Sequence, residues 1–178
     1  NLVSDGILWF IHADTLPPKS GAVLLLEAVN AGGDLGCFRF EFNSERLILK
    51  VNSFMTRFNF LGVRGGDQGI FMRCMAFKEL NGFDEKYVIM EEYDLLERAS
   101  QAGLAFRLLT ASMLVSARKY DHNSYFKVNW ANLKAFKAYK RGEAPEAIAK
   151  AYHEMLHHPT DSRNNSDERS SSVTSGKD

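Results

Sequence analysis

Three acidic side chains, Glu91, Glu92 and Asp94, occur close together at the predicted start of a helix. A carboxylate held at a helix end that projects into a cleft can remove a proton from a substrate hydroxyl as a general base. The helix macrodipole also favours negative charge in the first turn by about 0.3–1 kcal/mol, which explains such a cluster without any chemistry. Glu91 and Asp94 share a helix face, Asp94 can pair with Arg98 four positions on, and Glu92 points about 100° away. Both interpretations stay open.

Asp14 is the second candidate, because it lies in the polar cluster His12-Ala13-Asp14-Thr15 that follows the apolar run 7–11. Open α/β sheets place ligands just past the C-terminal ends of their buried strands. Carboxylate oxygens there suit Mg²⁺ or Mn²⁺ carrying substrate phosphates. The alternative is a turn or helix cap ahead of Thr15 and the two prolines.

The glycine-rich segment 65–69 can bring Asp67 and Gln68 to a substrate, since glycine permits close backbone approach. It lacks the spacing of a dinucleotide fingerprint or a P-loop, and an ordinary turn before a strand explains it equally well. Arg118 and Lys119, at the end of another predicted strand, can hold a diphosphate through charge-assisted hydrogen bonds. Two adjacent basic residues are also common on a solvated surface.

His153, Glu154 and His157 form a literal H-E-x-x-H, the spacing of zinc peptidases. Two imidazoles at this spacing share one helix face, with the glutamate as base. A catalytic zinc needs a third protein ligand, and the sequence that follows is His158-Pro159 and a polar tail. His122 or an upstream carboxylate would have to supply it. The alternative is the end of a surface helix, where histidine suits the dipole.

Composition sets the class of protein. The chain has 178 residues, 45% of them hydrophobic, enough for one sizeable core. Lys plus Arg and Asp plus Glu each number 22, so no overall field favours nucleic acid or an anionic membrane. Cys37 and Cys74 lack the spacing of a metal knuckle or redox motif. With no apolar run of about 18–20 residues and no signal-like start, we expect a cytoplasmic protein without a transmembrane segment.

Hydrophobic periodicity predicts mixed strands and helices, hence an α/β fold. The strand at 7–11 is predicted to be buried on both faces, as in a parallel sheet. The helix at 44–60 places Leu47, Val51, Phe54 and Phe58 on one apolar face, with Ser44 as its cap. The predicted strands are 7–11, 35–42, 70–72, 105–109 and 113–117, and the predicted helices are 17–30, 44–60, 74–80, 90–101, 125–140 and 145–157. Residues 1–158 are expected to form one domain, and 159–178 a disordered polar tail.

Four segments occur in a fixed order along the chain. They are Leu8-Trp9-Phe10-Ile11-His12-Ala13-Asp14-Thr15-Leu16-Pro17-Pro18, Gly66-Asp67-Gln68-Gly69-Ile70-Phe71-Met72-Arg73, Met90-Glu91-Glu92-Tyr93-Asp94-Leu95 and Ser116-Ala117-Arg118-Lys119-Tyr120. Together they resemble a family 2 glycosyltransferase with the GT-A fold, and the resemblance covers about residues 5–157. The closer resemblance is to the arsenosugar-biosynthesis subgroup associated with radical-SAM and selenodomain proteins.

The resemblance implies a role for each candidate. Asp14 matches the last acidic residue of the D-x-D-type motif, which binds Mn²⁺ or Mg²⁺ bridging the donor diphosphate, and His12 stands where many relatives have aspartate. Glu91-Glu92 matches the Glu-Asp motif, whose second carboxylate is the expected base for inverting transfer. The remaining implied roles are diphosphate binding by Arg118 with His12, and acceptor binding by Asp67, Gln68 and Asp94.

Family members begin with a βαβ nucleotide-binding half ahead of the D-x-D strand, and nothing before Asn1 matches it. The expectation is therefore a partial GT-A fold, a Rossmann-like mixed sheet flanked by helices with a helical C-terminal extension. Its activity would be transfer of a sugar from a nucleotide-diphosphate sugar to a small-molecule or lipid-linked acceptor hydroxyl. The alternatives are a non-catalytic binding module and the zinc peptidase. A sheet edge left open by the missing half would invite pairing with another chain, so a homo-oligomer also stays open.

Overall fold

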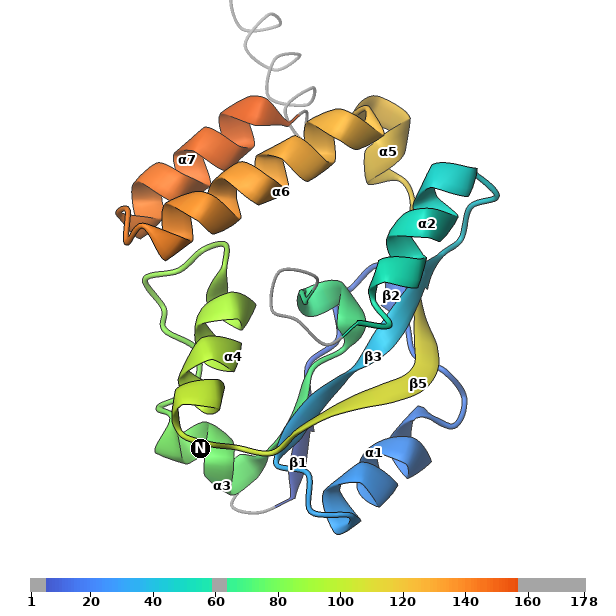
Figure 1. Ribbon diagram of the computed structural model, residues 1–178, viewed down its shortest axis with the longest axis vertical. Helices are drawn as coiled ribbons and strands as arrows, with labels where there is room; N and C mark the ends of the chain where they lie inside the picture. The colour runs from blue at the N-terminus through green and yellow to red at the C-terminus, as the bar shows by residue number, and fades with distance from the viewer. Residues whose placement is uncertain (1–5, 59–63, 157–178) are drawn as a thin grey trace, which may run out of the picture. The chain divides into compact units, whose positions relative to one another are not determined.

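The structure is a computed structural model that describes residues 6–58 and 64–156. It is mixed α/β, with one five-stranded sheet flanked by helices, which confirms the predicted class (Figure 1). Strands β3 and β5 are parallel, and the other neighbours are antiparallel. Across the sheet the strands are β1 (Ile7–Trp9), β4 (Phe71–Arg73), β3 (Leu35–Phe42), β5 (Phe106–Val115) and β2 (Thr15–Leu16).

The chain divides into two compact units, residues 1–119 and 120–178, and each is described by itself. The first contains the sheet and most of the shorter helices. In chain order the helices are α1 (Gly21–Asn30), α2 (Leu47–Met55), the 3₁₀ turn η2 (Gly66–Gln68), α3 (Cys74–Glu79), α4 (Glu91–Gln101), α5 (Lys119–His122), α6 (Tyr125–Lys140) and α7 (Pro145–Met155).

Two apolar clusters hold the sheet between helices in the first unit, because side chains of β3 alternate between its faces. Phe38 packs with residues of α1 on one face. Cys37 packs with residues of α3 and α4 on the other. Figure 1 shows α1 on one side of the sheet, with α3 and α4 opposite. Both side chains are fully buried, so the middle strand is a rigid base for the loops at its ends.

Two strand predictions are wrong in detail. β1 is shorter than predicted and only half-buried, because it lies at the end of the strand order and pairs with β4 alone, antiparallel. The strands predicted at 105–109 and 113–117 are one strand, β5. Its register against β3 shifts between Phe38 and Arg39, so Thr110 and Ala111 are extra residues in a bulge, and the sequence there looks like a break.

Two helix predictions also need correction. α1 begins at Gly21 rather than at the prolines, which lie in the preceding loop. α2 is shorter than predicted, and its cap position is Arg46 rather than Ser44. Its buried residues are Leu49 and Ser53, whereas Leu47 and Val51 are 76% and 55% exposed. The predicted apolar face of α2 therefore points to solvent, since the helix buries its opposite side.

Other boundaries agree with prediction. α3 ends at a turn in which Asn81 and Gly82 have positive φ, as the Asn-Gly pair indicates. α4 buries Leu95, Leu96 and Ala99 as expected, and ends before Gly103.

In the second unit, α6 and α7 lie side by side (Figure 1). Ser124 caps α6 by accepting a hydrogen bond from the Lys127 amide at 3.2 Å. Tyr152 Oη donates to Asn132 Oδ1 at 3.0 Å and links the two helices. In the part of the chain that the structure describes, no helix is long and apolar enough to cross a membrane.

Candidate functional site

The first side of the site is the segment that leaves β1. The Phe10 amide donates to Ile70 O at 2.8 Å, after which the chain leaves the sheet. A turn closed by Thr15 N and His12 O at 3.1 Å returns it to the sheet as β2. Asp14 O accepts the amide of Ser116 at 3.2 Å, which anchors this turn to the end of β5. His12 and Asp14 therefore project from a short connection fixed at both ends.

The second side is η2, which carries Asp67. Gly66 has His12 and Glu92 so close that a Cβ at this position would overlap His12 Nε2 and Glu92 Oε1. The sequence predicted that a glycine here permits close approach, and the groups that approach are side chains of the protein itself. The turn ends at Gly69, whose φ of 58° suits glycine.

The third side is the start of α4, where Glu91 and Glu92 follow Met90 at a positive φ of 74°. This conformation is unusual for a non-glycine residue and turns the chain sharply into the helix. The Glu92 side chain is only 13% exposed and reaches His12. Glu91 is half-buried, and its Oε2 atom has no hydrogen-bond partner among the described residues.

His12 lies between two carboxylates. Its Nε2 is 3.0 Å from Glu92 Oε1, and its Nδ1 is 3.4 Å from Asp67 Oδ1. Hydrogen bonds to Asp67 and then Glu92 raise the pKa of His12 to about 10, against the opposing effect of burial. The imidazole is therefore protonated at neutral pH and bridges the two acidic segments.

The pKa values of Asp67 and Glu91 are shifted in opposite directions from their usual values. Burial pushes the pKa of Asp67 upward, but the hydrogen bond from His12 and the positive charges of Lys119 and His12 outweigh it, and the pKa is lowered. The pKa of Glu91 is raised, chiefly by burial and then by the charge of Glu92. A carboxyl with a raised pKa is a stronger base once ionised, which suits proton transfer near neutral pH.

His12, Asp14 and Asp67 are the residues that can hold a metal ion. Each offers one ligand atom, and these atoms all lie within 4.8 Å of one another. The sequence predicted Asp14 as a metal ligand, and the folded chain adds an imidazole and a second carboxylate from segments that precede β2 and β4. No such group besides this one occurs among residues 6–58 and 64–156.

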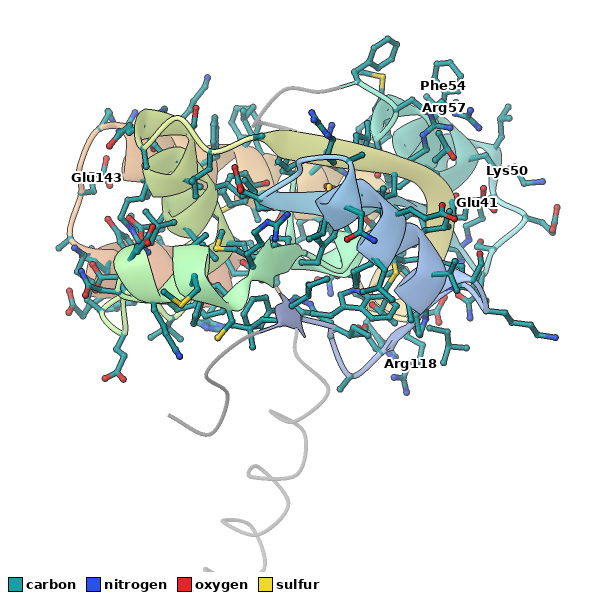
Figure 2. The ribbon with its side chains drawn as sticks, turned by 90° about the horizontal axis from the view of Figure 1, so that it is seen from below. Glu41, Lys50, Phe54, Arg57, Arg118 and Glu143 are labelled. Carbon is teal, nitrogen blue, oxygen red and sulfur yellow. The ribbon has the colours of Figure 1, made fainter. Side chains whose placement is uncertain are left out.

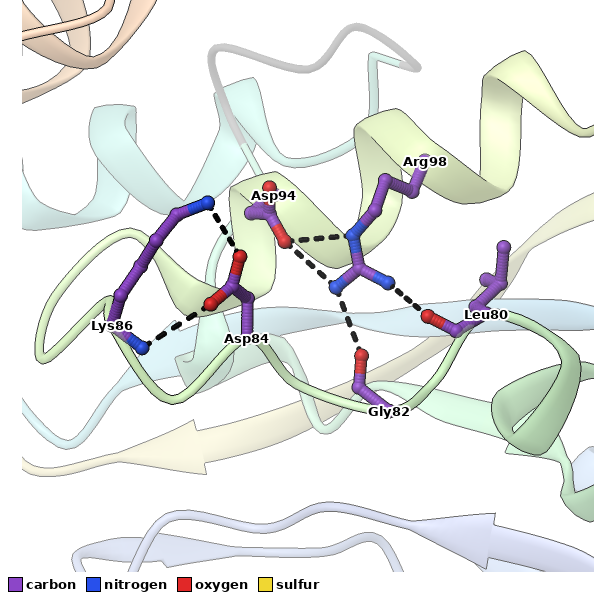
Figure 3. Close-up of polar contacts among 6 residues, drawn as sticks. All are labelled: Leu80, Gly82, Asp84, Lys86, Asp94 and Arg98. Atoms are coloured by element: carbon purple, nitrogen blue, oxygen red, sulfur yellow. Dashed lines mark hydrogen bonds and ion pairs between the residues drawn. The ribbon is translucent and has the colours of Figure 1, made fainter.

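Asp94, a predicted acceptor-binding residue, pairs with Arg98, which holds a loop. Its Oδ2 accepts from Arg98 Nη2 at 2.7 Å, the i,i+4 pairing that the spacing allows. Arg98 also donates to Leu80 O at 2.6 Å and to Gly82 O at 2.8 Å (Figure 3). The same close-up shows the neighbouring pair of Asp84 and Lys86. Arg98 therefore fixes the turn after α3 to the first turns of α4.

Gln68, the last residue of η2 and also predicted to bind acceptor, is fully buried. Its Oε1 accepts from Arg64 Nη1 at 3.4 Å and from Cys37 Sγ at 3.6 Å. Arg64 is 4% exposed and also donates to Thr56 O at 3.2 Å. The residue pattern does not indicate that Arg64 is buried, because a buried arginine between two elements has the same local sequence signal as a solvated one.

Arg118 follows β5 and is exposed, with Nε donating to Ser116 Oγ at 3.1 Å. It therefore lies two residues beyond the backbone anchor of Asp14, and Lys119 next to it acts on Asp67 electrostatically. In the second unit, His153 and Glu154 lie at the end of α7, while His157 lies outside the described residues. The zinc-peptidase prediction stays untested for that reason.

No family model, curated protein or solved structure matches this chain at a significant level.

Proposed function

We propose that the first unit is the metal-binding and acceptor-side part of a glycosyltransferase. The intact enzyme would move a sugar from a nucleotide-diphosphate donor to an acceptor hydroxyl with inversion. The observation that carries this proposal is the convergence of His12, Asp14 and Asp67 within 4.8 Å, with Glu92 hydrogen-bonded to the same imidazole. Three separate segments supply these groups, and each arrives by a fixed turn.

The donor set fits a divalent cation of the first transition row. One imidazole nitrogen and two carboxylate oxygens suit Mn²⁺ better than Mg²⁺, which favours an all-oxygen shell. A bound cation would neutralise negative charge on the leaving diphosphate. His12 must be neutral to act as a ligand, and its pKa near 10 means that metal binding releases a proton. Metal affinity should therefore rise with pH.

The protein's own residues supply the remaining roles. Glu92, fixed in place by His12, removes the proton from the acceptor hydroxyl. Arg118 and Lys119 contribute positive charge toward the donor phosphates. Gln68 and Asp94 act indirectly, because their contacts hold η2 and the start of α4 in place.

Glu91 is the second candidate base, and a specific observation favours it. Its pKa is raised and its Oε2 is buried without a partner in the described part of the chain, whereas Glu92 is already engaged by His12. The two residues differ by one position on α4, so matched Gln substitutions separate their roles.

The test measures release of nucleoside diphosphate from a panel of donor sugars with Mn²⁺ and hydroxyl acceptors. Asp14→Asn and either Glu92→Gln or Glu91→Gln should lower the rate about 10²–10⁴-fold with the fold retained. Glu27→Gln is the matched control, since it removes one charge from an exposed position of α1. Metal-independent release, or rates in Asp14→Asn equal to those of the control, would overturn the proposal.

A further inference from the structure

A cavity of about 330 Å³ in the first unit lies between α2 and the later half of β3. None of its lining residues belongs to the site around His12. α2 is held over the strand because the Phe40 amide donates to Thr56 Oγ1 at 3.4 Å and Leu49 is 1% exposed. The volume is in the range of small-molecule sites, large enough for a ligand of several heavy atoms beyond a single inorganic ion.

The charges around this cavity do not cancel. Among its lining residues, Lys50 is paired with Glu45 at 2.6 Å. Arg39 and Arg57, which also line it, have no carboxylate partner in residues 6–58 and 64–156. Two guanidinium groups and the Glu41 carboxylate therefore remain, which leaves a net positive charge that attracts an anion. Guanidinium also matches oxyanions in geometry.

Two buried polar atoms in the same wall lack partners within the described chain. Ser53 is 9% exposed, and its Oγ makes no hydrogen bond; Arg39 Nε is likewise buried without one. Both residues line the cavity. Buried donors are normally satisfied, so these two indicate a group that accepts hydrogen bonds at this place.

Other lining residues, Phe54 and Glu41 among them, can contact the part of a ligand that carries the anionic group. Phe54 and Arg57 lie together, with the guanidinium carbon 5.3 Å from the ring centroid, which orients the arginine. Glu41 Oε1 accepts from Ser112 Oγ at 2.9 Å, leaving a carboxylate in the cavity wall that can accept a ligand hydroxyl. Figure 2 shows Glu41, Lys50, Phe54 and Arg57 gathered on one side of the unit.

We propose that this cavity between α2 and β3 binds the phosphate group of a small phosphomonoester, held by Arg39, Arg57 and the Ser53 hydroxyl. A phosphate offers three acceptor oxygens to these three donors, whereas a carboxylate offers two. The bulge in β5 lies next to Arg39 in the sheet, and a β-bulge can change the direction in which a neighbouring side chain points.

The experiment is calorimetric titration of the whole chain with glucose 6-phosphate, inorganic phosphate, glucose and succinate at matched ionic strength. We expect glucose 6-phosphate to bind most tightly. Arg39→Gln and Arg57→Gln should each weaken it about tenfold or more. Arg107→Gln should not change the affinity for glucose 6-phosphate. Arg107 is an exposed arginine of β5 that lies opposite Gly36 in the sheet, at the other end of β3 from the cavity.

Circular dichroism and the melting temperature of each variant establish that it folds. Ser53→Ala is a second variant that keeps both charges and should still weaken binding. No binding, equal binding of succinate, no preference for the ester over inorganic phosphate, or equal losses in all three arginine variants would each overturn the proposal. Asp14→Asn should leave this binding unchanged, so the result is separable from that for the site around His12.

Discussion

Glu92 Oε1 at the start of α4 lies 3.0 Å from His12 Nε2 in the turn after β1, although 80 positions separate the two residues in the chain. Asp67, on η2, approaches the other nitrogen of the same imidazole. The positive charge of the imidazole therefore offsets the negative charges of Asp67 and Glu92, which would otherwise repel each other.

The first prediction concerns the coupling between His12 and Glu92. A double-mutant cycle with His12→Asn and Glu92→Gln should give a coupling energy of about 0.5–1 kcal/mol at low salt, because the imidazole is 46% exposed and water screens the pair. The free energy of unfolding of the four proteins, measured in urea, tests it. Additive effects would contradict the contact.

The same coupling should depend on pH. The pKa of His12 rises from 6.5 unfolded to about 10 folded, so the stabilising contribution is complete below pH 6.5 and disappears as the pH rises through 10. The difference in unfolding free energy between wild type and Glu92→Gln should therefore shrink between pH 7 and pH 11. A difference that grows over this range would contradict the assignment.

A second prediction uses two adjacent glycines. Ala at position 66 would place its Cβ against His12 and Glu92, whereas Cβ at Gly65 would meet nothing within 4 Å, and the φ of Gly65 is extended. Gly66→Ala should therefore lower the melting temperature and weaken Mn²⁺ binding, while Gly65→Ala should leave both near wild type. Scanning calorimetry and a metal titration compare the pair; similar behaviour of the two variants would argue against the close packing at Gly66.

A third prediction concerns the loop that Arg98 holds. Arg98→Lys keeps the charge but cannot reach Asp94, Leu80 O and Gly82 O together, so it should cost about 1–3 kcal/mol of unfolding free energy. Urea denaturation measures this loss. If Asp94→Asn and Arg98→Lys prove independent of each other, the pairing does not exist in solution.

A fourth prediction tests which side of α2 is buried. Leu49→Ala should cost about 2–5 kcal/mol, because Leu49 is 1% exposed, whereas Val51→Ala should change stability by less than about 0.5 kcal/mol. The two substitutions lie two positions apart on one helix and are compared in the same unfolding experiment. If Val51→Ala proved more destabilising than Leu49→Ala, the buried face of α2 would be the one predicted from periodicity.

Much of the architecture follows from the sequence, because hydrophobic period and glycine stops are local signals. β3 and α6 begin and end as predicted. The orientation of α2 could not be predicted, since Leu49 and Val51 are equally apolar and only the partner surface decides which one is buried. β5 was predicted as two strands because a bulge interrupts its pattern, although its pairing with β3 continues.

The candidate site, too, could be predicted from the sequence only in its local features. Asp14, Asp67 and Glu92 could each be chosen from residue type and local context, but spacing cannot show that His12 lies between two of them. Long-range contacts of this kind depend on the antiparallel pairing of β1 and β4, which places the end of β1 beside the start of β4. Gln68 and Asp94 were chosen by the same reasoning, and their contacts hold the structure of the site.

The most direct measurement is Mn²⁺ titration of the chain followed by electron paramagnetic resonance. We expect one tight Mn²⁺ site per chain, with an affinity that increases with pH as His12 loses its proton. Asp14→Asn and Asp67→Asn should each lower this affinity about tenfold or more. Glu27→Gln should bind as wild type does. Binding that is absent, or that is indifferent to both aspartate substitutions, would contradict the metal site and with it the proposed glycosyl transfer.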